Sequence, residues 1–234
     1  NNEFSYIIEP SLTFTAFIEE IHNGTFQLES LAQGFRNIEQ SSELFENLFE
    51  DVDLYSRRLG STPQKQNQHI SAVIKELADL DLSHQGDILG DAYEYLIGQF
   101  AESSGKKAGE FYTPRPVVRL MVNILDPKEG ETIYDPACGS GSLLLKFAKI
   151  LGKDKVRSGF FGQEINLTTY NLCRINMFLH DINYEKFDIA LGDTLLAPKH
   201  WDDEPFECIV SNPPYSIKWA GDENPLLIND PRFS

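Results

Sequence analysis

The pattern of hydrophobic and polar positions changes about halfway along the chain. Over residues 1–108, apolar side chains recur every three or four residues, as they do on one face of an amphipathic helix. This pattern predicts helices over residues 41–55, from Pro63 onward and after Gly86. Residues 1–40 are less periodic, and we expect helices and loops there. We therefore interpret residues 1–108 as an N-terminal helical domain.

A different pattern follows residues 103–109, whose small and charged side chains indicate a loop between domains. From there, short apolar runs alternate with stretches of helical periodicity. The runs predict strands over residues 132–135, 159–163, 187–191 and 206–210, and the periodic stretches predict helices over residues 114–126, 142–151 and 167–180. Strands that alternate with helices are typical of an α/β fold with a doubly wound, mostly parallel sheet.

The charge of the chain bears on its partners. Among 234 residues there are 20 lysines and arginines against 36 aspartates and glutamates, a formal net charge of −16. Residues 1–108 carry a net charge of −11, and residues 109–234 carry −5. Because nucleic-acid binders neutralise phosphates with basic side chains, the chain is not expected to bind nucleic acid unaided. The acidic helical half points to a surface for a partner.

Composition also indicates the cellular compartment of the chain and whether it holds disulfides or a metal. The longest apolar runs are far shorter than the roughly 20 residues that span a bilayer, and no cationic leader precedes an apolar run. We expect a cytoplasmic protein with no membrane association. Three cysteines, Cys138, Cys173 and Cys208, lie 35 residues apart without a CxxC pair. That spacing fits neither a disulfide framework nor a zinc site, so no metal is expected.

A glycine-containing loop, Asp135-Pro-Ala-Cys-Gly-Ser-Gly-Ser142, lies between a predicted strand and a predicted helix. Gly139 and Gly141 let the backbone approach a ligand, and the amides at the helix start face a polar group. Leu144 stands where a dinucleotide fingerprint has its third glycine, which disfavours a nicotinamide dehydrogenase. Asp135 instead suits a positively charged ligand such as S-adenosylmethionine. A tight turn that only packs helix on strand is the alternative.

Two more acidic residues end predicted strands. Glu164 follows the second strand and could accept hydrogen bonds from both hydroxyls of a ribose. Asp193 follows the third strand and could meet the adenine amino group of the same nucleoside. Each acid alone is ordinary, because strand ends often carry solvated acids. Together with Asp135 they would line one crevice at the carboxyl ends of parallel strands.

The segment Asn212-Pro213-Pro214-Tyr215 follows the fourth predicted strand. Two prolines cannot continue a sheet ladder, so they impose an extended turn and leave the Pro213 carbonyl without its usual partner. That carbonyl and the Asn212 side-chain oxygen could accept the two hydrogens of a planar amino group. Tyr215 offers a ring on which a flat substrate can stack. An ordinary proline-rich turn is the alternative.

These two loops resemble the hallmark loops of the adenine-specific DNA methyltransferases that use S-adenosylmethionine. Residues 86–96 and 109–115 are also similar to the modification subunit of type I restriction-modification systems, and the resemblance covers most of the chain. It implies a Rossmann-like methyltransferase domain over residues 109–234. Family members have three further strands beyond the last loop, so we expect this domain to be incomplete at its C-terminal end.

The resemblance implies roles for particular residues. The methionine end of S-adenosylmethionine would be held by Glu110, Phe111, Tyr112, Thr113, Pro114 and Arg115, with the Thr113 hydroxyl prominent. The rest of the cofactor would be bound by Asp135, Ala137, Gly139, Ser140, Gly141, Ser142, Glu164 and Asp193. Catalysis would fall to Asn212, Pro213, Pro214 and Tyr215. No strong base is required, and the five histidines lie outside these motifs.

The expected function is site-specific methylation of a flipped adenine at N6. The resemblance implies double-stranded DNA, reached through a specificity subunit, a restriction subunit with nuclease and translocase activity, and a second copy of the modification subunit as partners. We expect weak or absent activity from residues 1–234 alone. Two alternatives stay open: a protein-glutamine N-methyltransferase, because a side-chain amide presents the same amino group, and a non-catalytic helical scaffold.

Overall fold

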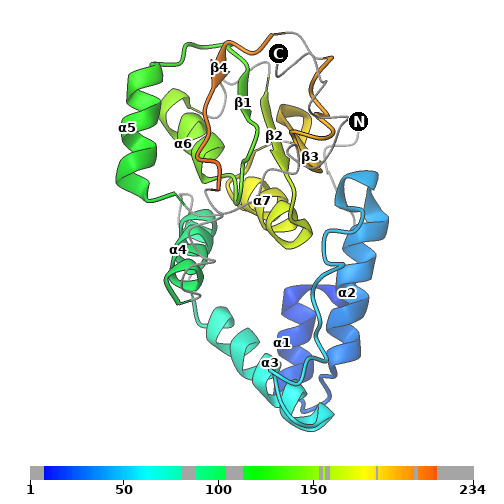
Figure 1. The fold of residues 1–234 in the computed structure, drawn as a ribbon. Coiled ribbons are helices and arrows are strands. Elements are labelled where there is room, and N and C mark those ends of the chain that lie inside the picture. The colour runs from blue at the N-terminus through cyan, green and yellow to red at the C-terminus, as the bar shows by residue number, and fades with distance from the viewer. Residues whose placement is uncertain are drawn as a thin grey trace. The chain divides into compact units, whose positions relative to one another are not determined.

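The computed structural model describes residues 8–80, 88–103, 113–152, 155, 159–182, 184–202 and 205–214. They belong to two compact units, Asn1–Gly86 and Asp87–Ser234, which Figure 1 colours blue to cyan and green to orange. In the described part of the chain, no helix combines the length and the apolar character that crossing a membrane requires.

Unit 1 is helical, as the periodicity predicted. Its elements are the 3-10 helix η1 (Pro10–Leu12), α1 (Phe14–His22), α2 (Leu28–Ser41), the 3-10 helix η2 (Glu43–Phe45) and α3 (Pro63–Ala78). The predicted start of α3 at Pro63 is confirmed, and the Thr62 hydroxyl caps it by accepting a hydrogen bond from the Lys65 N–H at 3.3 Å. Buried apolar side chains form the core of the unit: Phe17, Ile21, Phe26, Leu28 and Ile74.

The predicted helix over residues 41–55 is wrong. Only Glu43–Phe45 forms a short 3-10 helix, and turns follow it. Asn47 has a φ of 57°, in the left-handed region that ends helices. The Glu39 carboxylate accepts the Phe49 N–H at 2.7 Å, so that N–H does not take part in a helical hydrogen bond. Turns that bury every third or fourth side chain produce the same pattern as a helix face.

Unit 2 contains a four-stranded parallel sheet, which confirms the predicted α/β class. The strands are β1 (Ile133–Asp135), β2 (Phe160–Glu164), β3 (Phe187–Leu191) and β4 (Cys208–Ile209), in the order β3-β2-β1-β4. The helices are α4 (Ile88–Ser103), α5 (Arg115–Leu125), α6 (Ser142–Leu151) and α7 (Leu167–Leu179), with the 3-10 helix η5 (Tyr184–Lys186) before β3. This strand order is that of a Rossmann-like sheet.

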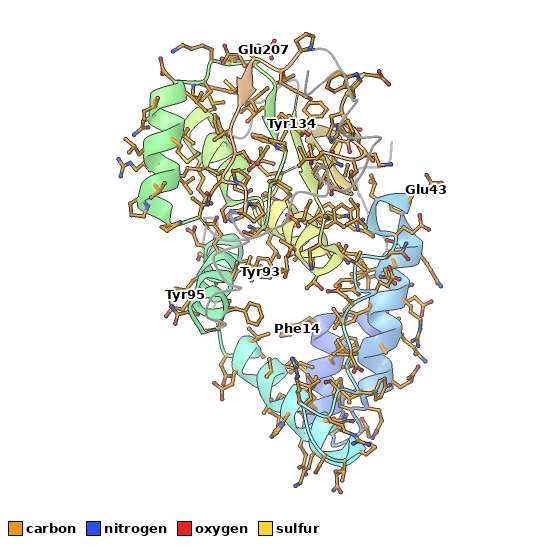
Figure 2. The ribbon with its side chains drawn as sticks, viewed as in Figure 1. Phe14, Glu43, Tyr93, Tyr95, Tyr134 and Glu207 are labelled. Carbon is orange, nitrogen blue, oxygen red and sulfur yellow. The ribbon has the colours of Figure 1, made fainter. Side chains whose placement is uncertain are left out.

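The two faces of the sheet are covered differently. Ile133 and Phe160 share one hydrophobic core with buried residues of α5, α6 and α7. Tyr134 and Phe161, the next residues along their strands, point to the other face. There the Phe206 ring stacks on that of Tyr134, which is labelled in Figure 2, with centroids 4.6 Å apart. The His200 ring lies 5.5 Å from both Tyr134 and Phe161. Of the two helix layers of a doubly wound sheet, the described residues therefore contain one.

The helix α4 belongs to unit 2, although the sequence prediction placed it in the domain over residues 1–108. The compact units divide between Gly86 and Asp87. In unit 2, Lys149 of α6 pairs with Asp91 of α4 at 2.6 Å, and Gly90 packs against the buried His180 ring beyond α7. Periodicity shows that a helix has an apolar face, but not which neighbour covers it.

Replacing Gly90 by alanine tests this packing. A Cβ at Gly90 would lie 2.5 Å from ring atoms of His180. In an exposed helix, alanine would stabilise by about 1 kcal/mol over glycine, but overpacking here should cost about 1–3 kcal/mol. Urea denaturation followed by tryptophan fluorescence reports on unit 2, because both tryptophans, Trp201 and Trp219, lie in it.

The matched control is Leu96→Ala in the same helix, where the residue is 61% exposed. This variant should change the free energy of unfolding by no more than about 0.5 kcal/mol. A Gly90→Ala chain as stable as the parent would contradict the close packing of α4 on His180.

Candidate functional site

The glycine loop lies where the sequence predicted it, between the end of β1 at Asp135 and the start of α6 at Ser142. Gly139 and Gly141 have φ values of 55° and 79°, in the left-handed region that favours glycine. A Cβ at Gly141 would also lie 2.7 Å from the Cys173 Sγ atom of α7. Gly141 is therefore required by backbone conformation and by close packing, while the two glycines together bring the loop backbone to the edge of the sheet.

Asp135 is fully buried at the head of this loop. One carboxylate oxygen accepts the Ala137 N–H at 3.0 Å, and the other has no hydrogen-bond partner among the described residues. Burial raises the pKa of Asp135 to about 7, an effect that the charge of Glu164 reinforces and that the hydrogen bond from the Ala137 N–H opposes. A buried acid with an unsatisfied oxygen is suited to a ligand that carries an N–H group or a positive charge.

Glu164 connects the end of β2 to the glycine loop. Its two oxygens accept the Gly139 N–H at 3.1 Å and the Asn166 N–H at 2.8 Å. Burial raises the pKa of this carboxyl, and the backbone hydrogen bonds oppose the rise. Each carboxylate oxygen can accept more than one hydrogen bond, so these contacts leave room for ribose hydroxyls.

The end of β3 is also tied to the loop. Asp193 accepts the Leu195 N–H at 2.8 Å and stabilises the turn after the strand. The Thr194 hydroxyl donates to the Pro136 carbonyl at 2.6 Å. The acids at the ends of β1, β2 and β3 thus lie at one edge of the parallel sheet, as the sequence predicted. Thr194 was not singled out, although its place beside Asp193 was a signal.

Asn176 is a second residue that the sequence analysis missed. It lies on α7, is fully buried, and donates from Nδ2 to the Ser140 carbonyl at 2.9 Å. The Ser140 hydroxyl lies 3.1 Å from the Ser142 hydroxyl. An amide in the middle of a helix that packs on the sheet was the available signal, because buried polar groups need partners.

Asn212 and Thr113 meet, although 99 residues separate them along the chain. The Asn212 Nδ2 atom donates a hydrogen bond to the Thr113 hydroxyl at 3.2 Å. Pro114 follows Thr113 as the N-cap of α5, and Pro213 and Pro214 follow Asn212 outside any helix or strand. Thr113, the first described residue of the segment expected to hold the methionine end of a cofactor, therefore contacts the loop expected to accept an amino group.

Several expected site residues lie outside the described residues. They are Glu110, Phe111, Tyr112 and Tyr215, together with the side chain of Arg115. Their expected roles stay predictions.

The sheet order and the acids at the carboxyl ends of three strands define a Rossmann-like α/β domain with its candidate site at that edge. The chain belongs to the N-6 DNA methylase family, whose model matches residues 84–234. This membership confirms the family that the two loops indicated.

Individual relatives agree with the family. The chain is 39% identical to the type I restriction enzyme MpnII methylase subunit of Mycoplasma pneumoniae, over 97% of this chain and 47% of the relative. The methyltransferase subunit of a type I restriction-modification system from Streptococcus thermophilus is 53% identical, with a TM-score of 0.87 over 99% of this chain and 50% of that one. A chain solved in work on complex assembly of the type I R-M system is 26% identical, with a TM-score of 0.53, over 86% of this chain and 48% of that one. The chain thus spans about half the length of these relatives.

The raised pKa of Asp135 predicts how stability depends on pH. The carboxyl keeps its proton up to about pH 7 in the folded chain, but only up to about pH 3.8 in the unfolded chain. The folded chain therefore binds more protons between these values, and the free energy of unfolding falls as the pH rises through them. The free energy of unfolding falls by at most about 4 kcal/mol for this reason.

An Asp135→Asn variant should lack this dependence of stability on pH, because it has no titrating carboxyl at this position. Its amide oxygen can still accept the Ala137 N–H, and no charge is buried. The gain in stability over the parent chain should be larger at pH 8 than at pH 5, measured by urea denaturation with tryptophan fluorescence. A difference that is the same at both pH values would contradict a buried, proton-binding Asp135.

Proposed function

We propose that the chain is part of the modification subunit of a type I restriction-modification system, which transfers the methyl group of S-adenosylmethionine to N6 of adenine in DNA. The observation that carries the proposal is the contact between Asn212 and Thr113. It brings the amino-acceptor loop against the segment implied to hold the methionine end of the cofactor. Family membership and the identity to type I methylase subunits support the same function.

Different residues of the chain would bind different parts of the cofactor. Glu164 would accept hydrogen bonds from the ribose, and Asp193 would meet the adenine amino group of the cofactor. Asp135, which has an unsatisfied oxygen in a buried position, would stabilise positive charge nearby. S-adenosylmethionine supplies an electrophilic methyl group on a positively charged sulfur.

The adenine amino group is a poor nucleophile, because its lone pair is conjugated with the ring. Hydrogen bonds from its two protons to the Asn212 side-chain oxygen and the Pro213 carbonyl would favour a pyramidal nitrogen. The nitrogen lone pair forms the new bond to the methyl carbon as the carbon–sulfur bond breaks, which leaves a neutral thioether. Positive charge develops on the nitrogen, so the two hydrogen bonds strengthen in the transition state, and the nitrogen then loses one proton to water. Such a site needs an adenine that has left the duplex, and Tyr215 would stack on the flipped base.

Charge explains why partners are needed. With a net charge of −16, the chain gains little from DNA phosphates on its own. A specificity subunit would supply positive charge and sequence readout. A restriction subunit and a second modification subunit would complete the assembly, in the cytoplasm, where the substrate DNA lies.

Two other functions use parts of the same structure. A protein-glutamine methyltransferase would act on the same kind of amino group, because a glutamine side chain carries one. Tritium transfer to a release factor, but not to DNA in the presence of a specificity subunit, would favour that function. A non-catalytic scaffold would bind partners through its helices but would produce no heat with S-adenosylmethionine in calorimetry. The family match over residues 84–234 favours DNA.

Asn212→Ala tests the assignment. In the whole subunit, reconstituted with its specificity subunit, the variant should lose methyl transfer by about a hundredfold or more, because the acceptor for the target amino group is gone. Its affinity for S-adenosylmethionine should stay within about threefold of the parent. Tritium transfer to duplex DNA measures the first quantity and calorimetry the second.

Asn123→Ala is the matched control, because Asn123 is an exposed asparagine on α5 to which no role in the site is assigned. It should transfer methyl groups at the rate of the parent subunit. Full methylation by a folded Asn212→Ala subunit would overturn the role given to Asn212.

A further inference from the structure

One face of α7 packs on the glycine loop. Asn176 donates a hydrogen bond from Nδ2 to the Ser140 carbonyl at 2.9 Å. A Cβ at Gly141 would lie 2.7 Å from the Cys173 Sγ atom and 3.1 Å from the Met177 Cε atom. Residues three and four positions apart are neighbours on a helix surface, so 173, 176 and 177 share one face of α7. The two apolar side chains of this face fix how closely the loop approaches, and the asparagine adds a directed bond.

Asn176 fixes the orientation of one peptide unit in the loop. The peptide that joins Ser140 to Gly141 has its carbonyl paired with Asn176, and its N–H donates to the Cys138 carbonyl at 2.9 Å. A rotation of this peptide plane would break both hydrogen bonds and leave buried backbone groups without partners. Glycine can adopt several backbone conformations, so a loop that contains it needs such contacts to keep one of them.

The surroundings of Asn176 indicate that it contributes more than stability. Its side chain is fully buried, and Oδ1 has no hydrogen-bond partner among the described residues. A buried amide oxygen without a partner destabilises a fold, and an apolar side chain of similar size would avoid this cost. What an apolar side chain could not supply is a donor to the Ser140 carbonyl, which can only accept.

We propose that Asn176 is a positioning residue for the methyltransferase site, which holds the Ser140–Gly141 peptide in the orientation that binds S-adenosylmethionine. This role rests on the proposed function and extends it to a residue of α7 that acts through the glycine loop. Without the bond, the loop adopts other conformations, and the apparent affinity for the cofactor falls with the fraction of chains that keep the competent one. Bound cofactor restores that conformation, so the rate of transfer changes little.

Asn176→Ala tests this role in the whole subunit, reconstituted with its specificity subunit. The variant should bind S-adenosylmethionine about tenfold more weakly in calorimetry, with a similar rise in KM, because it lacks the donor to Ser140. Its kcat at saturating cofactor should stay within about threefold of the parent value. Hydrogen exchange without cofactor should be faster over residues 138–141 than in the parent subunit, because the loop opens more often.

Asn171→Ala is the matched control, because Asn171 is a second buried asparagine of α7. Its Oδ1 atom accepts a hydrogen bond from Arg174 of the same helix at 3.2 Å, and no role in the glycine loop is assigned to it. This variant should lower the unfolding temperature, as Asn176→Ala does. It should leave the affinity for S-adenosylmethionine within about twofold of the parent and hydrogen exchange over residues 138–141 unchanged.

Asn176→Asp separates the hydrogen bond from the shape of the side chain. A protonated aspartic acid has nearly the shape of asparagine and can donate to the Ser140 carbonyl, whereas an ionised one cannot. Compared with the parent subunit at the same pH, this variant should bind S-adenosylmethionine nearly as well at pH 5 and about tenfold more weakly at pH 8. Comparison at equal pH removes the effect of Asp135, which titrates in this range.

This variant still decides the question if Asn176→Ala does not fold, because the protonated side chain fits the same space at pH 5. Binding that is equally weak, relative to the parent, at pH 5 and pH 8 would contradict a role for the hydrogen bond. Thermal unfolding at each pH checks that the variant is folded.

The role of Asn176 and the proposed function fail separately. If the parent subunit bound S-adenosylmethionine and a folded Asn176→Ala variant bound it equally well, or lost no more affinity than Asn171→Ala, the positioning role would be overturned and the proposed function would stand. If the parent subunit bound no S-adenosylmethionine, the proposed function would fail, and the role of Asn176 with it.

Discussion

Parallel pairing of β1 with β2 on one side and with β4 on the other is the constraint on which the candidate site depends. The pairing aligns Asp135 with Gly162 and Tyr134 with Ile209, so all these strands end at the same edge of the sheet. Whatever follows each strand must then converge there. The glycine loop, Glu164 and Asn212, which are far apart in sequence, become neighbours because of this register.

The acids at that edge stabilise the fold through hydrogen bonds to the backbone, independently of any ligand. Asp135 accepts the Ala137 N–H, Glu164 accepts the Gly139 N–H, and Asp193 accepts the Leu195 N–H. Each carboxylate therefore orders the backbone that follows a strand. The edge of the sheet is consequently negative and partly desolvated. Such an environment favours the binding of a cation over that of an anion. This preference explains why a positively charged cofactor suits the site better than a pyrophosphate.

The sequence analysis succeeded where local signals and tertiary packing agree. The strands of the parallel sheet and the helix that begins at Pro63 follow directly from apolar runs and from a proline at a helix start. It failed over residues 41–55, because successive turns can bury the same side chains as a helix. Asn47, in the left-handed region, and the Glu39 carboxylate, reaching from ten residues away, decide that segment. Neither effect is visible in a periodicity of apolar positions.

The sequence by itself determined the class of fold, the glycine loop, the acids at the strand ends and the loop at Asn212. These depend on short-range rules of backbone conformation and on the alternation of strand and helix. Only the tertiary structure decided that α4 packs in unit 2, that Asn212 meets Thr113, and that Asn176 meets the Ser140 carbonyl. Such juxtapositions depend on which helix face covers which neighbour. Packing between residues distant in sequence makes that choice. An example is Gly90, whose lack of a side chain lets the His180 ring pack against α4.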